Sequence, residues 1–313
     1  MIRYEAKSNG SPLREAVLGI GVFDGVHLGH RRIMSEVAEL SRRTGAAPVA
    51  VTFFPHPREV LCPDSPPRLL LPPEERLRRL REAGAATIGI IKFSAEIAAT
   101  APADFLDRIL AKTPQVRGVC VGAHWRFGRN GAGDTRFLDA ELARRHVAFK
   151  AVPELEIDGG VVSSSAIRDA VAAGELDRAE RMLGSAACLY GAVERGFHEA
   201  TEILKTPTAN LRVSYGVLPP NGVYATWAVI DGRRFPSITN IGVAPTFGRD
   251  LAPRRVETHL LDFSGDLYRR DLVIELKRKL RDEIRFPSPA ELRRQIGADC
   301  EQALQILYDG ACK

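Results

Sequence analysis

Hydrophobic and polar positions follow two different patterns along the chain, and the change falls near Gly184. From Ala16 to about Val152, short apolar runs alternate with segments whose apolar residues recur at helical spacing. Such alternation predicts an α/β domain in which helices cover a parallel sheet and ligands bind beyond the carboxyl ends of the strands. The expected strands are 16–23, 48–54, 87–91, 116–121 and 148–152, and the expected helices are 28–40, 74–83, 103–110 and 135–145.

Beyond Gly184 the pattern favours antiparallel hairpins. Apolar runs cover residues 223–230, 256–263 and 272–276, and a further strand is expected from Arg233, after the Asp231-Gly232 turn. Ser288-Pro289-Ala290-Glu291 then has the form of a capping box with proline at the first helical position. We therefore expect a small antiparallel β-barrel followed by a C-terminal helix, with one domain at residues 1–185 and the other at 186–313.

Composition and charge narrow the class of protein. A chain of 313 residues with 45% hydrophobic and 27% charged residues is long enough for two globular domains. The N-terminus is charged where a signal peptide would be apolar, and no run approaches a membrane span, so we expect a cytoplasmic protein with no membrane partner. The five cysteines are widely spaced without a CxxC pair, which predicts free thiols.

The net charge of +5 suits anionic substrates such as nucleotides. Basic residues gather at 76–81, 254–255, 269–270 and 277–281, within amphipathic or alternating segments. We expect these to be solvated faces and no nucleic acid to be a partner. The pattern does not specify an oligomeric state. Proline-rich Cys62 to Pro73 is expected to be a loop that covers the site as a flap.

The candidate chemistry begins where the first strand meets the first helix. His27 and His30 fall at the start of the helix, three residues apart, so they share one face. Unpaired N–H groups and the helix dipole favour an anion there, and Gly25 and Gly29 remove side chains that would block a phosphate. Both imidazoles could donate hydrogen bonds to phosphoryl oxygens as charge develops.

Other interpretations of this segment remain open. The histidines could be ordinary helix-start residues or a zinc pair, although no third cysteine or histidine lies close by. A dinucleotide-binding turn fits poorly because Asp24 breaks the GxGxxG spacing. Similarly, Ser164, Ser165 and Arg168 could hold a pyrophosphate at a helix start or be a serine cap with a surface arginine.

Four motifs of the first half together carry a resemblance to a known family. Residues 21–30 (GVFDGVHLGH) are similar to GxFDGxHxGH, the first signature of the bacterial bifunctional riboflavin kinase/FAD synthetases. Residues 163–168 (SSSAIR) resemble SSTxIR, residues 121–128 (VGAHWRFG) resemble VGxDFRFG, and residues 52–57 (TFFPHP) resemble TFxPHP. The resemblance implies a Rossmann-like HxGH nucleotidyltransferase domain.

The same resemblance implies roles for individual residues. His27 and His30 would stabilise a transferring phosphoryl group, while Trp125 and Phe127 would bind flavin. Without the resemblance, Trp125 is equally a core aromatic in a glycine-rich loop, and His56 is equally a structural histidine in a proline turn. The residues expected to bind nucleotide and phosphates are Gly21, Phe23, Asp24, Gly25, Gly29, His56, Ser164, Ser165 and Arg168.

The second half resembles riboflavin kinases. Residues 207–210 (PTAN), 240–247 (NIGVAPTF) and 256–263 (VETHLLDF) match its motifs in order. The resemblance implies that Thr208 and Asn210 hold Mg²⁺ and ATP phosphates and that Glu257 is the base that takes a proton from the ribityl hydroxyl. Taken alone, Glu257 in an alternating strand would be a solvent-facing residue.

The resemblance implies FAD biosynthesis, in which AMP passes from ATP to FMN and riboflavin is phosphorylated to FMN, with Mg²⁺ as cofactor. The chain departs from the family between Phe197 and Thr206, where it has neither the usual glycines nor the arginine, and this predicts weaker kinase activity. Two alternatives stay open. The barrel could be a catalytically inactive flavin-binding domain, or the protein could be a non-enzymatic flavin or nucleotide sensor.

Overall fold

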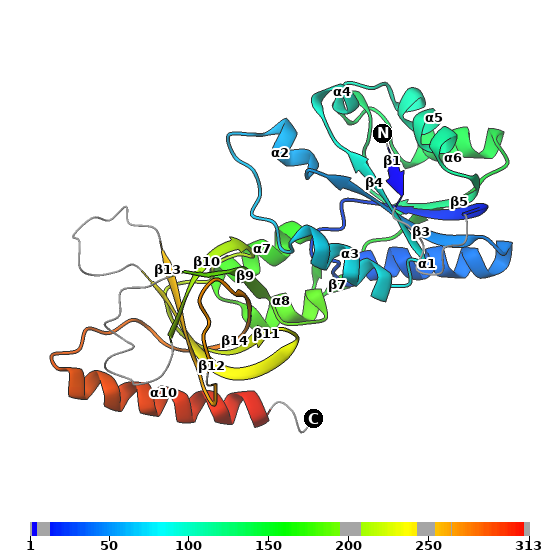
Figure 1. Cartoon of the computed structure of the whole chain (residues 1–313). Coiled ribbons are helices and arrows are strands. Elements are labelled where there is room, and N and C mark those ends of the chain that lie inside the picture. Colours follow the sequence, from blue (N-terminus) through cyan, green and yellow to red (C-terminus); the bar gives the residue numbers. More distant parts are fainter. Residues whose placement is uncertain (1, 5–12, 195–207, 243–253, 264, 310–313) are drawn as a thin grey trace. The chain divides into compact units, whose positions relative to one another are not determined.

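The computed structural model describes residues 2–4, 13–194, 208–242, 254–263 and 265–309. These divide into two units (Figure 1): Met1–Pro67 with Pro73–Ser163, and Arg68–Pro72 with Ser164–Lys313. A short piece of the first half thus belongs to the second unit. The domain boundary at residues 185 and 186 stays a prediction.

The first unit is built on a six-stranded sheet with the order β1-β4-β3-β2-β5-β6. All neighbours are parallel except β1, which pairs antiparallel with β4. The predicted strands are therefore present, and β1 and the short hairpin of β7 and β8 are additions. The strands are β1 (Ile2–Tyr4), β2 (Glu15–Ile20), β3 (Ala47–Phe54), β4 (Thr87–Lys92), β5 (Gln115–Gly122), β6 (Ala148–Val152), β7 (Glu156–Ile157) and β8 (Gly160–Val161).

Helices lie on both faces of this sheet. On one face α1 packs against Gly19 and Gly118, since a Cβ at these positions would lie 2.9 Å from Val37 and 2.4 Å from Leu40. On the other face, side chains of α5 and α6 join those of β2 and β5 in one core cluster. The helices are α1 (Leu28–Thr44), α2 (Pro57–Leu61), α3 (Pro73–Glu82), α4 (Ala95–Ala98), α5 (Pro102–Lys112) and α6 (Thr135–Arg144), with a 3₁₀ turn, η1, at Arg129–Gly131.

The end of β2 differs from the expected strand. The strand stops at Ile20 rather than Phe23 because Phe23 has a φ of 57°, in the left-handed region that a strand cannot use. In contrast, the loop expected at Cys62–Pro73 contains no helix or strand up to Pro72, and α3 begins at Pro73.

The second unit is a closed antiparallel barrel with the order β10-β13-β12-β11-β14-β9. Its interior holds a chain of buried hydroxyls, in which Thr226 bonds to Ser237 and Thr239, both at 2.8 Å, and Thr239 to Thr258 at 3.0 Å. The elements of this unit are α7 (Ser164–Ala173), α8 (Leu176–Leu183), β9 (Cys188–Glu194), β10 (Thr208–Tyr215), β11 (Gly222–Ile230), β12 (Arg233–Gly242), β13 (Arg255–Leu260), β14 (Asp271–Arg281) and α10 (Pro289–Asp309).

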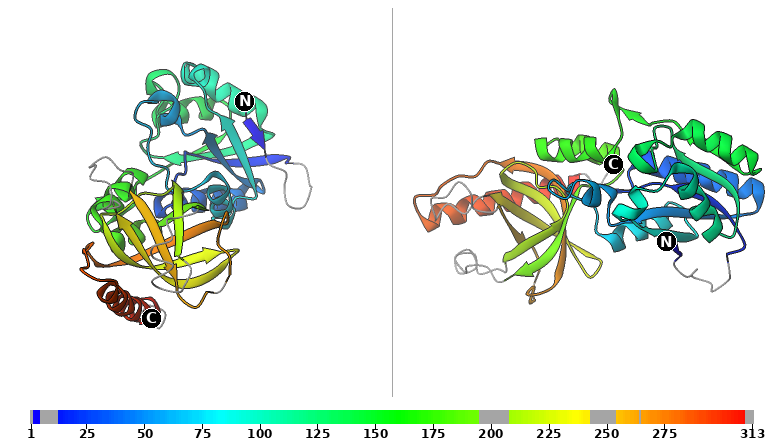
Figure 2. Two further views of the ribbon diagram at one scale, coloured as in Figure 1. Left: turned by 60° about the vertical axis from the view of Figure 1, so that its left-hand side comes forward. Right: turned by 90° about the horizontal axis from the view of Figure 1, so that it is seen from above.

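Helix α10 lies along the outside of the barrel (Figure 2). Its apolar side, including Ala303 and Leu307, packs with Val223 and Ile238 of the barrel. As predicted, Pro289 is its first residue, and Ser288 Oγ accepts a hydrogen bond from the N–H of Glu291 at 3.3 Å. No helix in the described part of the chain is long and apolar enough to span a membrane.

The segment Arg68–Pro72 is fixed to the second unit by its backbone. The carbonyl oxygen of Leu69 accepts a hydrogen bond from the N–H of Gly216 at 2.8 Å, and that of Arg68 accepts one from Arg168 Nε at 2.7 Å. Leu70 and Leu71 are buried. The predicted loop is thus anchored in the second unit along part of its length.

Candidate functional site

The two histidines of the first unit form a stacked pair at the start of α1. Their ring centroids are 3.6 Å apart and the rings are 18° from parallel. His27 is the N-cap of the helix, and its Nδ1 accepts a hydrogen bond from the N–H of His30 at 3.3 Å. The side chains predicted to bind phosphate therefore lie together at the positive end of a helix of 17 residues.

Hydrogen bonding determines which nitrogen of each imidazole carries the proton. Because His27 Nδ1 accepts a hydrogen bond, the proton of a neutral His27 is on Nε2. His30 Nδ1 is buried without a hydrogen-bond partner among the described residues, so a proton on this nitrogen would have no acceptor. The tautomer with the proton on Nε2 is therefore favoured in His30 as well. Burial, followed by the charges of His27 and Arg76, holds the pKa of His30 well below 6.5.

The turn between β2 and α1 is held by several contacts. The carbonyl oxygen of Val22 accepts hydrogen bonds from Thr52 Oγ1 at 2.9 Å and from Arg76 Nη1 at 3.0 Å. The ring of Phe23 contacts that of His30 edge to face, with centroids 5.1 Å apart. Asp24 is buried within this turn. At Gly29, a Cβ would lie 3.2 Å from the His27 ring, a tight contact that the ring would have to shift to relieve.

Topology brings other predicted residues to the same edge of the sheet. β2 lies between β3 and β5 and is parallel to both, so the chain segments that follow these three strands begin side by side. This is the point at which the strand order reverses, where α/β sheets bind ligands. Trp125 and Phe127 follow β5 and stack with centroids 4.7 Å apart. His56 follows β3 and caps α2 by accepting the N–H of Arg58 at Nδ1, 3.1 Å away.

The serine and arginine motif belongs to the second unit. Ser164 and Ser165 are the first residues of α7, and Arg168 lies one turn further along the helix. The hydroxyls are thus at a helix start, as predicted, while Arg168 donates to the carbonyl of Arg68. Thr208 begins β10. The segment Phe197–Thr206, whose lack of glycines predicts weaker kinase activity, lies outside the described residues.

On the barrel, register places Glu257 between two asparagines. Glu257 of β13 is directly opposite Asn210 of β10 on one side and Asn240 of β12 on the other. Directly opposite residues have Cβ atoms about 5 Å apart. Since Thr208 and Asn210 are two residues apart on β10, they point to the same face as Glu257. The three residues expected to serve the kinase reaction are therefore neighbours.

Asn240 links this row of residues to a second carboxylate. Its Nδ2 donates to Glu283 Oε1 at 3.5 Å, and Asn221 Nδ2 donates to Glu283 Oε2 at 3.4 Å. The described residues contain no group of three or more His, Cys, Asp or Glu side chains that could hold a metal ion. The four described cysteines carry no disulfide, in agreement with the expected free thiols.

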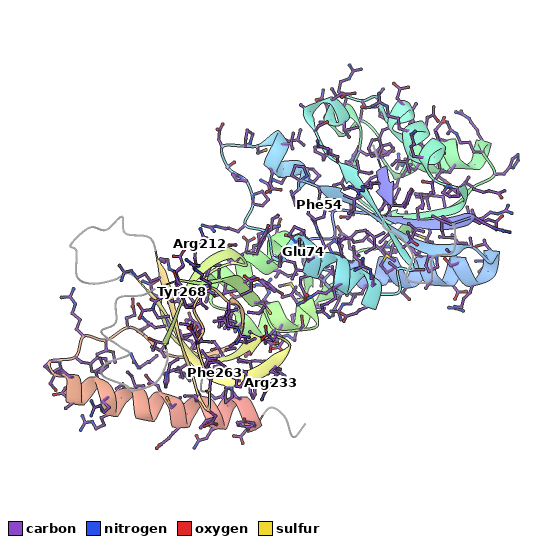
Figure 3. All side chains as sticks on the ribbon, viewed as in Figure 1. Phe54, Glu74, Arg212, Arg233, Phe263 and Tyr268 are labelled. Carbon is purple, nitrogen blue, oxygen red and sulfur yellow. The ribbon has the colours of Figure 1, made fainter. Side chains whose placement is uncertain are left out.

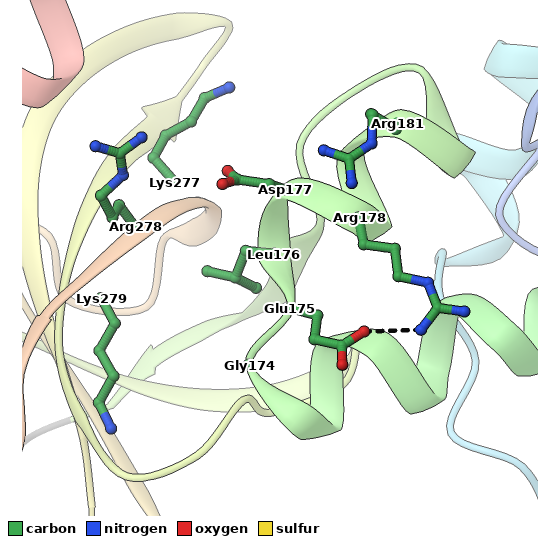
Figure 4. A pocket seen from close by; sticks show the side chains of 9 residues that line it. All are labelled: Gly174, Glu175, Leu176, Asp177, Arg178, Arg181, Lys277, Arg278 and Lys279. Carbon is green, nitrogen blue, oxygen red and sulfur yellow. Dashed lines mark hydrogen bonds and ion pairs between the residues drawn. The ribbon is translucent and has the colours of Figure 1, made fainter. Parts of the chain in front are cut away.

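A pocket of about 460 Å³ lies elsewhere, between α8 and β14 of the second unit (Figure 4). Five basic side chains line it, but ion pairs tie Arg178 to Glu175, Lys277 to Glu180 and Lys279 to Asp282. It contains none of the residues predicted to act on phosphate or flavin. We therefore place the candidate chemistry at the sheet edge and at the row around Glu257.

Two family models cover most of the chain. One, described as FAD synthetase, matches residues 10–166, and the other, described as riboflavin kinase, matches residues 183–307. The chain belongs to the bifunctional riboflavin kinase/FMN adenylyltransferase family. It is 37% identical to the protein of that name from Pseudomonas fluorescens, over 95% of each chain. It is 35% identical to the Escherichia coli K12 protein, covering 96% of this chain and 95% of that protein.

A solved structure shares this fold. A crystal structure described as a macrolide-efflux protein from Streptococcus pneumoniae has a TM-score of 0.81 and 27% identity, covering 93% of this chain and 94% of the other. Membership of the bifunctional riboflavin kinase/FMN adenylyltransferase family confirms the resemblance read from the sequence. The α/β domain followed by a closed barrel and a C-terminal helix is confirmed as well.

Two residues near the sites of this family member were not singled out from the sequence. Arg76 was expected on a solvated face, but it is 1% exposed. The available signal was its spacing, because Arg76 lies one helical turn before the buried Leu80. In the sequence, Asn240 is recognisable only as part of the NIGVAPTF motif. Its pairing with Glu257 on the neighbouring strand is what places it near the site.

Proposed function

We propose that this protein makes FAD in two steps, phosphorylating riboflavin to FMN with ATP and then transferring AMP from ATP to FMN. The names of the matching family models and of the relatives support both activities. The α/β unit carries out the adenylyl transfer and the barrel carries out the phosphorylation. ATP, FMN and riboflavin are the substrates.

In the adenylyl transfer, an oxygen of the FMN phosphate attacks the α-phosphorus of ATP, and the bond from that phosphorus to pyrophosphate breaks. The Nε2–H groups of His27 and His30 donate to the phosphoryl oxygens as negative charge grows, and the N-terminus of α1 adds its dipole. A nucleophile from the protein is not needed. Ser164, Ser165 and Arg168 hold the departing pyrophosphate through hydroxyls and fixed positive charge.

Flavin and nucleotide contacts surround these groups. Trp125 stacks on Phe127, which is buried in the core of the first unit, so the outer face of the Trp125 ring is the apolar surface for an isoalloxazine ring. The buried His56 follows β3, where its Nδ1 accepts the capping hydrogen bond of α2, and its imidazole contacts a phosphate. Gly21, Gly25 and Gly29 leave room for the phosphate close to the backbone.

In the phosphorylation, the oxygen of the ribityl hydroxyl attacks the γ-phosphorus of ATP and ADP leaves. Glu257 takes the proton of that hydroxyl during the attack. Thr208 and Asn210 would hold Mg²⁺ through a hydroxyl and an amide oxygen on one face, because this ion takes oxygen ligands, and phosphates and water would supply the others. When bound, the ion would neutralise phosphate charge. Asn240 lies directly opposite Glu257 on the neighbouring strand.

The stacked His27 and His30 pair at the start of α1 is the observation that carries the adenylyl transfer. The test is a pair of substitutions with opposite effects. His30→Ala should lower FAD formation from FMN and ATP by about 100- to 1,000-fold, while FMN formation from riboflavin persists. Glu257→Gln should lower FMN formation and leave FAD formation from added FMN. Loss of both products in either variant would contradict the assignment of one reaction to each unit.

The remaining expectations follow from this function. We propose that the protein is located in the cytoplasm, because its substrate ATP is supplied there. Its partners are small molecules rather than nucleic acid or membranes. The basic residues at 254–255, 269–270 and 277–281 serve solubility in this proposal. Product analysis with riboflavin, ATP and Mg²⁺ separates this proposal from an inactive barrel, which would yield FAD only from FMN, and from a sensor, which would release no pyrophosphate.

A further inference from the structure

Arg76 is a charged residue in a place that apolar side chains normally occupy. It lies on α3 and is 1% exposed, and its Cζ is 4.0 Å from the ring centroid of Phe54, the last residue of β3. Phe54 is labelled in Figure 3. Burying an arginine is costly, and a leucine or methionine would fill the same space more cheaply. The position of its guanidinium therefore calls for a function.

The guanidinium holds the backbone at the start of the turn between β2 and α1. Arg76 Nη1 donates to the carbonyl oxygen of Val22 at 3.0 Å, and Thr52 Oγ1 donates to the same oxygen at 2.9 Å. The next residue, Phe23, has a φ of 57°, and Val26 has a φ of 42°; both conformations are strained for residues with a side chain. Strain of this kind persists only where surrounding contacts hold the backbone.

Phe23 connects this backbone to the imidazoles. Its ring meets the His30 ring edge to face at 5.1 Å, and His30 stacks on His27. A shift of the Val22 carbonyl would therefore move Phe23 and change the position of His30. We propose, on the basis of the adenylyltransferase function proposed above, that Arg76 is a positioning residue that acts through the Val22 carbonyl on His27 and His30.

The charge of Arg76 supports the same role. The groups whose charges act on the His30 imidazole are His27 from the start of α1 and Arg76 from α3, and both lower its pKa, after burial as the largest cause. Phe23, which packs against the ring from the turn, is apolar. Arg76 thus adds to the lowering of the His30 pKa while it holds the Val22 carbonyl.

The experiment measures FAD formation from FMN and ATP in the full chain. Arg76→Met removes the donor and the charge at similar length, Arg76→Lys restores the charge and one donor, and Thr52→Val removes the second donor to the carbonyl without changing size. Arg78→Met is the matched control, since Arg78 lies on the same helix with its side chain 55% exposed. In a Trp227→Phe background, Trp125 fluorescence during thermal unfolding checks that the first unit is folded, and FMN formation from riboflavin checks the second.

We expect Arg76→Met to lower kcat by about 10- to 100-fold with the KM for ATP within about threefold, because a misplacement near 1 Å has an effect of this size. Arg76→Lys should recover part of the loss, and Thr52→Val should lower kcat in the same direction. In ¹⁵N-histidine spectra, the pKa of His30 should rise in Arg76→Met and stay unchanged in Thr52→Val. The kcat of Arg78→Met should equal that of the wild type.

The outcomes separate this inference from the function on which it rests. If the wild type forms no FAD, the proposed function is wrong. If the wild type forms FAD and folded Arg76→Met does so at the same kcat, the positioning role is wrong. A normal kcat in Thr52→Val would exclude the route through the Val22 carbonyl. If the loss of kcat in Arg76→Met only matched the fraction of unfolded protein, the positioning role would be wrong as well.

Discussion

Replacing Asp299 by alanine should destabilise the barrel unit far more than breaking a surface ion pair. The Asp299 side chain is 2% exposed and accepts hydrogen bonds from Arg281 Nε at 3.0 Å, Arg281 Nη2 at 2.8 Å and Gln295 Nε2 at 2.9 Å. Without the carboxylate, the Arg281 guanidinium would remain in place with no anion. Removing one partner of a buried pair costs about 3–5 kcal/mol.

The expected value lies at the lower end of that range. The Arg281 side chain is 17% exposed and also donates to the carbonyl oxygen of Asp282, so it keeps some compensation. We therefore expect a loss of about 3 kcal/mol in the free energy of unfolding. The matched control is Glu275→Gln, which breaks the pair of Glu275 with Arg234 at 2.6 Å on the same barrel. Such exposed pairs contribute less than about 1 kcal/mol.

The assay uses the two tryptophans of the chain, one of which lies in each unit. In a Trp125→Phe background, Trp227 reports on the barrel and on the docking of α10, because its ring contacts Tyr308 with centroids 5.5 Å apart. With a urea dependence of about 1–3 kcal/mol per M, Asp299→Ala should lower the unfolding midpoint by about 1–3 M. A midpoint for Asp299→Ala that is no lower than that of Glu275→Gln would refute the reasoning.

Three further predictions concern the first unit. Gly29→Ala should lower FAD formation by about tenfold or more without unfolding the protein, because the new Cβ displaces the His27 ring; a normal rate would show that the ring can move without cost. Since the pKa of folded His30 is depressed, the unfolded state binds the extra proton, so stability is full above about pH 6.5 and falls as the pH drops below it. In urea titrations of a Trp227→Phe background followed by Trp125 fluorescence, His30→Asn should show a shallower decline. A fragment of residues 1–185 should fold and convert FMN to FAD, and failure to fold would place the boundary elsewhere.

The sequence predicts the elements with strong periodicity and misses those that depend on distant contacts. The five parallel strands and α1 follow from their apolar patterns, and the histidines of α1 follow from their position at its start. The end of β2 is not predictable in the same way, because nothing in the letters shows that Phe23 takes a positive φ. Strands β9 and β10 were not expected, since the closure of the barrel is what pairs them.

The same contrast applies to the sites. Glu257 and Asn210 are recognisable from their motifs, but only the register makes Asn240 their neighbour. His27 is not a usual capping residue, so its use of Nδ1 as a helix cap could not be predicted from capping preferences. Arg76 looks like one of several surface arginines until α3 is packed against the end of β3.

The closure of the barrel by β9 and β14 has a consequence for synthesis on the ribosome. Ala192 pairs with Asp271, so the barrel stays an open sheet with an unpaired edge until β14 has emerged. The sheet of the first unit, in contrast, is complete once β6 has been made. Leu70 and Leu71 are translated early but belong to the second unit. These two apolar side chains therefore stay exposed to water until residues that follow Ser163 have been made. A nascent chain stalled before α7 should therefore present this leucine pair to chaperones.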